Sequence, residues 1–130
     1  IKDNHIAAAG SIAKAVEIMR EYLTSPEFHL QFELKEEEVQ IEIEVTNENQ
    51  VKEALGCGIK KLLIDNQSIA SLKKLVSLAR QIDVGAKLEA SGGVNLDNVA
   101  EVAATAVDYI SIGALTHSAP AADFSLEVTE

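Results

Sequence analysis

The sequence has few aromatic residues, few basic residues, one cysteine and no long apolar run. Only 4% of the residues are aromatic whereas 47% are hydrophobic, so the core must consist mostly of Ile, Leu, Val and Ala. The single cysteine, Cys57, excludes an internal disulfide and suits a reducing compartment, so we expect a cytoplasmic protein. Cys57 lies between two glycines at an expected helix end, where a small structural residue fits better than a nucleophile.

The shortage of basic residues and of long apolar runs excludes further classes. The 21 acidic and 11 basic residues give a net charge of −10, whereas a nucleic-acid partner would need a basic face. The sequence contains no run of 18 apolar residues and no basic-then-apolar leader, so we expect neither a membrane span nor a signal peptide within it. We expect one domain, 1–130, and because Ile1 appears where a strand would already be ending, we expect a fragment of a larger fold.

Hydrophobic periodicity predicts alternating strands and helices. The alternating runs 28–34 and 39–45 predict two strands, which the charged break 35–38 would let form a hairpin. Helices are expected to begin directly after three capping residues, Ser11, Asn47 and Ser68. Further strands are expected at 61–64, 86–89 and 109–112. This order predicts βαβ units and a parallel sheet.

Polar residues recur at the ends of the expected strands. Glu44, Asp65, Glu89 and Ser111 are separated by 21, 24 and 22 positions, about the length of one strand, one helix and two loops. They should therefore emerge at one edge of the sheet, where parallel α/β folds bind ligands. In the second alternating run, Glu42 and Glu44 share a face, and they are functional only if that face looks into a closed interior.

The stretch Ser91-Gly92-Gly93 follows an expected strand and precedes an expected helix start at Asn95. Glycines let a backbone approach a ligand closely, and a helix start offers unpaired N–H groups to an anion. A tight strand-to-helix turn would need the same residues for structural reasons alone. Barrels, however, bind phosphate with the loops after their last two strands, which here are this stretch and Gly113 to Leu115.

The size of the chain limits the barrel that it can form. A complete eight-unit barrel needs about 250 residues, so the chain provides about the C-terminal half of one. The expected fold class is α/β, a partial parallel barrel, with a flavodoxin-like open sheet as the alternative. A half barrel exposes unpaired strand edges, which favour association.

Five blocks in this order closely resemble quinolinate phosphoribosyltransferase, the carboxylating nicotinate-nucleotide pyrophosphorylase family of NAD biosynthesis. The blocks are IKDNHIAAAGS (1–11), IEIEV (41–45), LIDN (63–66), LEASGGVNL (88–96) and VDYISIGALTHS (107–118). The resemblance implies an N-terminal sandwich domain followed by a TIM-like seven-stranded α/β barrel, of which this chain would be the C-terminal part. It also implies transfer of a phosphoribosyl group from phosphoribosyl pyrophosphate to quinolinate with Mg²⁺, giving nicotinate mononucleotide, pyrophosphate and CO₂.

The resemblance also implies roles for individual residues. Lys2 matches a lysine that helps to hold the substrate's carboxylate, and Glu44 and Asp65 match catalytic acids placed around the ribose hydroxyls and the metal. The residues that match the loops holding the 5′-phosphate are Ser91, Gly92, Gly93 and Gly113. Lys2 could instead be a surface lysine, and Glu42 could take the place of Glu44. His5 and His117 are expected to hold loops by hydrogen bonding.

The chain departs from the family pattern in two ways. Segment 24–40 is longer and more charged than the family's connection there, and Ala106 stands where a glycine is usual. The family's basic cluster, which grips the two anionic substrates, lies upstream of Lys2, so we expect the 130 residues alone to have no measurable activity. Family members resemble dimers that share sites between subunits, so a homodimer or higher homo-oligomer is expected of the full-length protein.

Two other functions remain open at this point. One is a different barrel enzyme that acts on a sugar phosphate and would not need the block from Lys2 to His5. The other is a half barrel without catalytic activity that serves as an assembly module.

Overall fold

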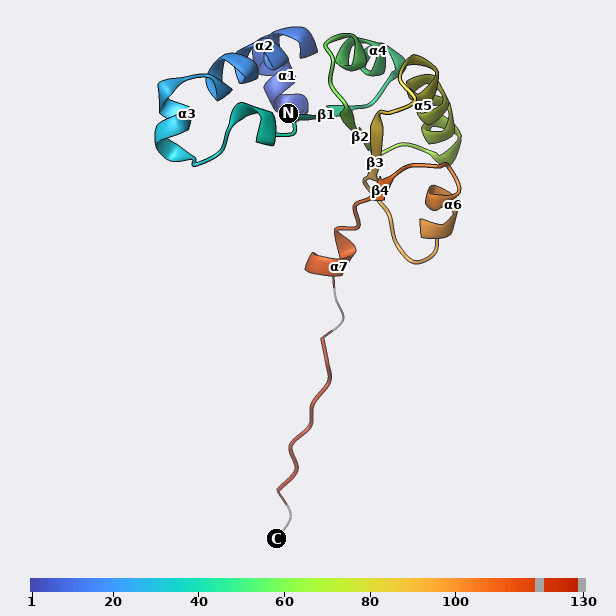
Figure 1. Cartoon of the computed structure of the whole chain (residues 1–130). Coiled ribbons are helices and arrows are strands. Elements are labelled where there is room, and N and C mark those ends of the chain that lie inside the picture. Colours follow the sequence, from blue (N-terminus) through green and yellow to red (C-terminus); the bar gives the residue numbers. More distant parts are fainter. Residues whose placement is uncertain (119–120, 129–130) are drawn as a thin grey trace.

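A computed structural model describes residues 1–118 and 121–128 and shows a curved parallel sheet with helices arranged in an arc around it (Figure 1). The predicted domain, 1–130, also includes residues 119, 120, 129 and 130, which lie outside the described part. Among the described residues, no helix is long and apolar enough to cross a membrane. The elements, in chain order, are α1 (Asp3–Ala9), α2 (Ile12–Leu23), α3 (Pro26–Gln31), the 3₁₀ turn η1 (Glu36–Glu38), β1 (Glu42–Val45), α4 (Glu48–Gly56), β2 (Lys61–Asp65), α5 (Ile69–Ile82), β3 (Lys87–Ser91), α6 (Val99–Ala103), β4 (Tyr109–Ile110) and α7 (Ala114–His117).

The four strands pair in sequence order, β1-β2-β3-β4, and every pair is parallel. Ile1 extends the sheet at the β1 edge, because its nitrogen donates to the Glu42 carbonyl (2.6 Å) and its carbonyl accepts from the Glu44 N–H (2.9 Å). These bonds agree with the prediction that a strand ends at Ile1, although Ile1 belongs to none of the four strands. A doubly wound sheet would reverse its strand order at a switch point, and this sheet does not. The partial parallel barrel is thus confirmed over the flavodoxin-like alternative.

The two faces of the sheet differ in chemistry because successive strand residues point to opposite sides. The outer face is apolar, and the helices bury it; it consists of Ile43, Val45, Leu62, Ile64, Leu88 and Ala90. The inner, concave face is mostly charged; it consists of Glu42, Glu44, Lys61, Leu63, Asp65 and Glu89. This pattern matches a barrel wall whose inner side lines a functional interior.

All three predicted helix caps are present. The side-chain oxygens of Ser11, Asn47 and Ser68 accept hydrogen bonds at 3.1, 3.1 and 3.2 Å from the backbone N–H groups three residues later. Each cap satisfies one of the donors that a helix start leaves free. The helices that pack on the outer face therefore begin where local sequence specifies.

The predicted strand over 28–34 is wrong, and with it the hairpin. Ser25 caps α3 by accepting from the Phe28 N–H (3.2 Å), and Pro26 occupies the first helical turn, where its missing N–H costs nothing. Phe28 is buried with its ring 5.7 Å from that of Tyr22 and 5.1 Å from that of Phe32. This aromatic packing favours the helix, and β1 begins only at Glu42 rather than at residue 39.

Residues 3–9 form a helix, α1, whereas His5 was expected to lie in a loop. The Lys2 N–H donates to Nδ1 of His5 (3.0 Å), and Gly10 ends the helix in the left-handed conformation (φ 90°). His5 therefore holds local structure, as predicted.

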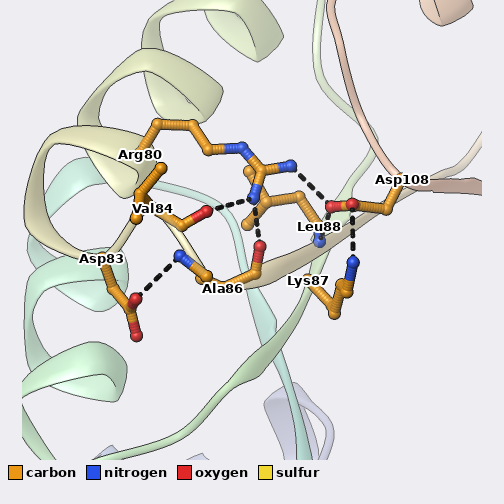
Figure 2. A network of polar contacts seen from close by, with 8 residues as sticks. Arg80, Asp83, Val84, Ala86, Lys87, Leu88 and Asp108 are labelled. Carbon is orange, nitrogen blue, oxygen red and sulfur yellow. Dashed lines mark hydrogen bonds and ion pairs between the residues drawn. The ribbon is translucent and has the colours of Figure 1, made fainter.

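A polar network ties β3 to β4 at their amino ends (Figure 2). The Asp108 carboxylate accepts from the Leu88 N–H (2.8 Å) and pairs with Arg80 (2.6 Å) and Lys87 (3.3 Å). Arg80, near the end of α5, also donates to the carbonyls of Val84 and Ala86 in the segment between α5 and β3. Because β4 is only two residues long, this network fixes the position from which the chain enters Ser111 and Gly113.

Candidate active site

The loop after β3 lies against the loop after β2. The Asn66 N–H donates to the Ser91 carbonyl (2.8 Å), and Asn66 itself adopts a left-handed conformation (φ 50°). Gly92 has φ 89°, and a Cβ atom there would lie 2.8 Å from both the backbone nitrogen and the Cα of Asn66. Gly92 is therefore required by its conformation and by the close approach of the two loops.

A cavity of about 500 Å³ opens beside this loop. Its lining residues are Ser91, Gly92, Gly93, Val94, Asn95, Ser111, Gly113, Ala114 and His117. The structure thus brings Ser91, Gly92 and Gly93 together with Gly113, as predicted from the spacing of the strand ends.

Several backbone donors around the cavity are free. Within residues 1–118 and 121–128, the N–H groups of Gly92, Gly93, Gly113 and Ala114 make no hydrogen bond to a protein acceptor. Backbone N–H groups that converge on a hollow form a site for an anion. The loop chemistry therefore suits a phosphate group.

The predicted helix start at Asn95 is wrong, because α6 begins at Val99. Residues 95–98 instead form a turn in which Asn98 Oδ1 accepts from the Asn95 N–H (2.9 Å) and Asn98 Nδ2 donates to the Gly93 carbonyl (3.0 Å). Asparagine side chains that bond to nearby backbone favour turns over helices. The free donors of the cavity therefore come from loop residues and not from the start of α6.

His117 also lines the cavity, although only a role in holding the loop was expected of it. Its Nδ1 lies 2.7 Å from the Ser118 hydroxyl oxygen, and its Nε2 lies 2.7 Å from where a Cβ of Gly113 would be. The histidine thus packs over Gly113, and any side chain at Gly113 would displace it. The signal in the sequence is the spacing of four residues between Gly113 and His117, which one helical turn brings together.

Lys2 and Glu44 meet on the concave face, with Nζ and Oε2 3.9 Å apart. The Lys2 side chain is 73% exposed, whereas that of Glu44 is only 9% exposed. Glu44 Oε2 is buried without a hydrogen-bond partner among the described residues. A buried carboxylate oxygen without a donor is costly, so this position favours a ligand that supplies a donor or a cation.

Asp65 lies closer to the cavity than Glu44 does. Asp65 pairs in register with Ser91, while Glu44 pairs with Leu63, two residues earlier on β2. The predicted site residues therefore form two groups: Lys2 with Glu44, and Asp65 with the cavity loops. The described residues contain no group of three or more His, Cys, Asp or Glu side chains that could hold a metal ion.

Three further charged residues lie together on the concave face: Lys61, to which the sequence assigned no role, Glu89, which was expected only at the ligand edge, and Glu42, which was the alternative to Glu44. Lys61 Nζ lies 3.3 Å from Glu42 Oε2 and 3.2 Å from Glu89 Oε2, and 5.2 Å from the centre of the Tyr109 ring. Glu89 also accepts a hydrogen bond from the Ser111 hydroxyl. Glu42 and Glu44 each have one buried oxygen without a hydrogen-bond partner among the described residues. They differ in their cation, because Glu42 pairs with the half-buried Lys61 and Glu44 lies beside the exposed Lys2.

Comparison with known proteins gives a consistent result. A model of the family described as "Quinolinate phosphoribosyl transferase, C-terminal domain" matches residues 1–127. Probable carboxylating nicotinate-nucleotide pyrophosphorylases from Synechocystis sp. and Bacillus subtilis are each 36% identical, over 98% and 99% of this chain and 39% of their own lengths.

A solved structure shares both sequence and fold with the chain. The nicotinate-nucleotide pyrophosphorylase of Ehrlichia chaffeensis is 41% identical and superposes with a TM-score of 0.73, covering 91% of this chain and 37% of its own. The chain thus spans about two fifths of the length of the curated relatives it matches. It belongs to the family of the quinolinate phosphoribosyl transferase C-terminal domain.

Proposed function

We propose that the chain supplies the C-terminal part of the barrel of a carboxylating nicotinate-nucleotide pyrophosphorylase, a phosphoribosyltransferase of NAD biosynthesis. In that reaction phosphoribosyl pyrophosphate and quinolinate give nicotinate mononucleotide, pyrophosphate and CO₂. The observation that supports this most directly is the cavity that joins Ser91, Gly92 and Gly93 to Gly113 beside the end of β2. Its free N–H groups suit the 5′-phosphate that the substrate and the product have in common.

The carboxylates suit the charge that develops during phosphoribosyl transfer. Loss of pyrophosphate leaves positive charge on the ribose ring, and fixed carboxylates in a site that excludes water stabilise such charge. Asp65 extends from the strand end next to the cavity, and Glu44 is held nearly buried on the same face. We assign ribose contacts to both, and to Lys2 a contact with a carboxylate of quinolinate.

Mg²⁺ is the proposed cofactor, and the oxygen donors on the concave face fit it. Mg²⁺ prefers oxygen ligands and is commonly held by one or two carboxylates together with water and substrate phosphates. Glu44 has a buried oxygen without a donor, and Asp65 has a carboxylate at the strand end. The bound ion would balance the negative charge of the pyrophosphate group.

The chain alone should not catalyse the reaction. Its net charge is −10, and Lys2 is the one cation that matches the family's site, so the field of the chain opposes two highly anionic substrates. The proposed enzyme needs the rest of the barrel and its basic residues. We further propose a homodimer or higher homo-oligomer for the complete protein, and a cytoplasmic location.

Three measurements test the proposal. Calorimetric titration of the 130-residue chain with nicotinate mononucleotide, phosphoribosyl pyrophosphate and inorganic phosphate should show weak binding of the phosphate compounds, because the cavity donors act against the negative field of the chain. Incubation of the chain with phosphoribosyl pyrophosphate and quinolinate should give no nicotinate mononucleotide. A chimera in which residues 1–127 replace the matching part of the Bacillus subtilis relative should form nicotinate mononucleotide. A folded chimera without this activity would contradict the proposal, as would turnover by the isolated chain.

A further inference from the structure

Four polar side chains, one from each of β1, β2 and β3 and one just after β4, are linked in a row across the concave face by ion pairs and a hydrogen bond. Glu42 on β1 pairs with Lys61 on β2, Lys61 pairs with Glu89 on β3, and Glu89 accepts from Ser111, just after β4. We call Glu42, Lys61, Glu89 and Ser111 the interior network. It ends at the cavity, because Ser111 is one of the residues that line it.

The interior network keeps Glu89 ionised. The hydrogen bond from Ser111 and the nearby Lys61 ammonium lower the pKa of Glu89, and they outweigh partial burial, which would raise it. The hydrogen bond to Glu89 in turn raises the pKa of Lys61, so the lysine stays charged. An ionised carboxylate can only accept hydrogen bonds.

The state of Glu89 decides what Ser111 can offer to a ligand. A serine hydroxyl has one hydrogen, and here it is donated to Glu89. Ser111 can therefore offer only the lone pairs of its oxygen to the cavity. An ionised phosphate oxygen also has only lone pairs, so it makes a poor partner for Ser111, whereas a hydroxyl group makes a good one.

The cavity has room for more than a phosphate group. Its volume of about 500 Å³ lies within the range of small-molecule sites, about 300–1,000 Å³. The free N–H groups of Gly92, Gly93, Gly113 and Ala114 come from two loops, while Ser111 precedes the second loop by two residues. The donors for phosphate and the acceptor for a hydroxyl are thus separate parts of one cavity.

We propose that Ser111 accepts a hydrogen bond from a sugar hydroxyl of the ligand and that Glu89 is its positioning residue. The cavity then selects a phosphate ester with a neighbouring hydroxyl over inorganic phosphate. Backbone N–H groups bind the phosphate, and Ser111 accepts a hydrogen bond from the sugar. This inference rests on the proposed function and adds a specificity determinant to the same site.

The test compares two ligands that share a phosphate group. The 130-residue chain and its variants are titrated with inorganic phosphate and with ribose 5-phosphate, and binding is followed by NMR chemical shifts. Ser111→Ala should weaken binding of ribose 5-phosphate about fivefold to tenfold, which corresponds to one hydrogen bond of about 1 kcal/mol. Binding of inorganic phosphate should stay within about twofold of wild type, because its donors are backbone groups.

Glu89→Gln separates positioning from a merely structural role. The Gln amide group is neutral and its NH₂ can donate to Ser111 Oγ, which lets the Ser111 hydroxyl turn and donate to phosphate. The affinity for inorganic phosphate should then rise while the preference for ribose 5-phosphate falls. A structural role would lower both affinities together. Ser77→Ala and Glu101→Gln, on the outer helices α5 and α6, are the matched controls and should change neither affinity.

Each result decides a different point. Equal weakening of both ligands by Ser111→Ala, or no weakening of either, overturns the inference and leaves the proposed function standing. Loss of both affinities in Glu89→Gln overturns the positioning role, and circular dichroism establishes that the variant is folded. If the wild-type chain binds neither ligand, the cavity alone is not a phosphate site and the inference fails, while the chimera still decides the proposed function.

Discussion

Gly92 and Asn66 approach so closely that a Cβ atom on Gly92 would lie 2.8 Å from the Asn66 backbone nitrogen. Gly92 has φ 89°, and Gly10, at the end of α1, has nearly the same φ of 90° with no atom within 4 Å of a Cβ position. Both glycines adopt a backbone conformation that would strain any other residue, but only at Gly92 would a Cβ atom also collide with neighbouring atoms. This contrast separates the conformational requirement for glycine from the requirement for space.

We predict that Gly92→Ala destabilises the chain more than Gly10→Ala does. Left-handed strain alone should cost Gly10→Ala about 1–2 kcal/mol in the free energy of unfolding. Gly92→Ala should cost a further 1–3 kcal/mol, roughly the penalty of overpacking, and should weaken phosphate binding. Urea unfolding and phosphate titration of both variants measure the difference. Equal destabilisation by the two substitutions would contradict the steric argument.

Asp108→Asn should destabilise the chain and change its response to acid. Burial alone would raise the pKa of Asp108, but the Leu88 N–H and the Arg80 guanidinium outweigh it, so the pKa lies below its ordinary value. The lowered pKa stabilises the fold fully above the unfolded pKa of about 3.9, and this stabilisation is lost as pH falls through the lower folded value. Loss of the charged acceptor should cost about 1.5–3 kcal/mol at neutral pH.

Unfolding curves between pH 2 and pH 7 check this prediction. The difference between wild type and Asp108→Asn should be constant above about pH 5 and should shrink as the solution becomes more acidic, because a protonated Asp108 has lost the same interactions. Asp123→Asn, in the exposed C-terminal segment, is the control and should follow the wild type. A difference independent of pH would show that the charge of Asp108 does not stabilise the network.

Lys61→Met should lower stability at neutral pH, because it leaves Glu42 and Glu89 without their shared cation. The pKa of Glu89 is lowered by Ser111 and by Lys61, so without the lysine it should rise toward its ordinary value. The destabilisation should therefore diminish below the ordinary Glu pKa of about 4.3, where Glu89 takes up a proton. Thermal unfolding at pH 7 and pH 4 measures this change.

Lys60→Met is the matched control for Lys61→Met. Lys60 is the preceding residue, and its ammonium pairs with Asp83 at the surface with 68% of the side chain exposed. Exposed ion pairs contribute little to stability, so the control should unfold close to the wild type at both pH values. A similar loss in both lysine variants would contradict the assignment of a special role to the concave face.

The sequence predicts local features of this fold better than it predicts the segments governed by tertiary contacts. The caps at Ser11, Asn47 and Ser68 follow from side chains that bond to nearby backbone, so local sequence suffices. The run 28–34 alternates like a strand but forms α3, because Phe28 packs against Tyr22 and Ser25 caps the helix. Alternation alone does not reveal which partner a residue will find.

The candidate site shows the same division. Even spacing of strand ends predicts that Ser91–Gly93 and Gly113 meet, because parallel strands end at one edge. The link from Lys61 to Glu89 and Ser111 depends on strand register and side-chain direction, which composition and spacing do not specify. The start of α6 at Val99 was missed because Asn95 and Asn98 bond within a turn.

Glu44 should show opposite effects on stability and on activity. Its side chain is 9% exposed and its Oε2 has no hydrogen-bond partner among the described residues, so the ionised group is poorly compensated in the isolated chain. Glu44→Gln removes that charge and should raise the free energy of unfolding by about 0.5–2 kcal/mol, as substitutions at strained functional positions often do. The same substitution should abolish nicotinate mononucleotide formation by the chimera, because the acid assigned to the ribose is lost. Glu42→Gln should not stabilise the chain, because Glu42 also has a buried oxygen without a partner but its other oxygen is paired with Lys61. If Glu44→Gln destabilises the chain, Glu44 is a structural residue held by Lys2, and its assignment to the active site is wrong.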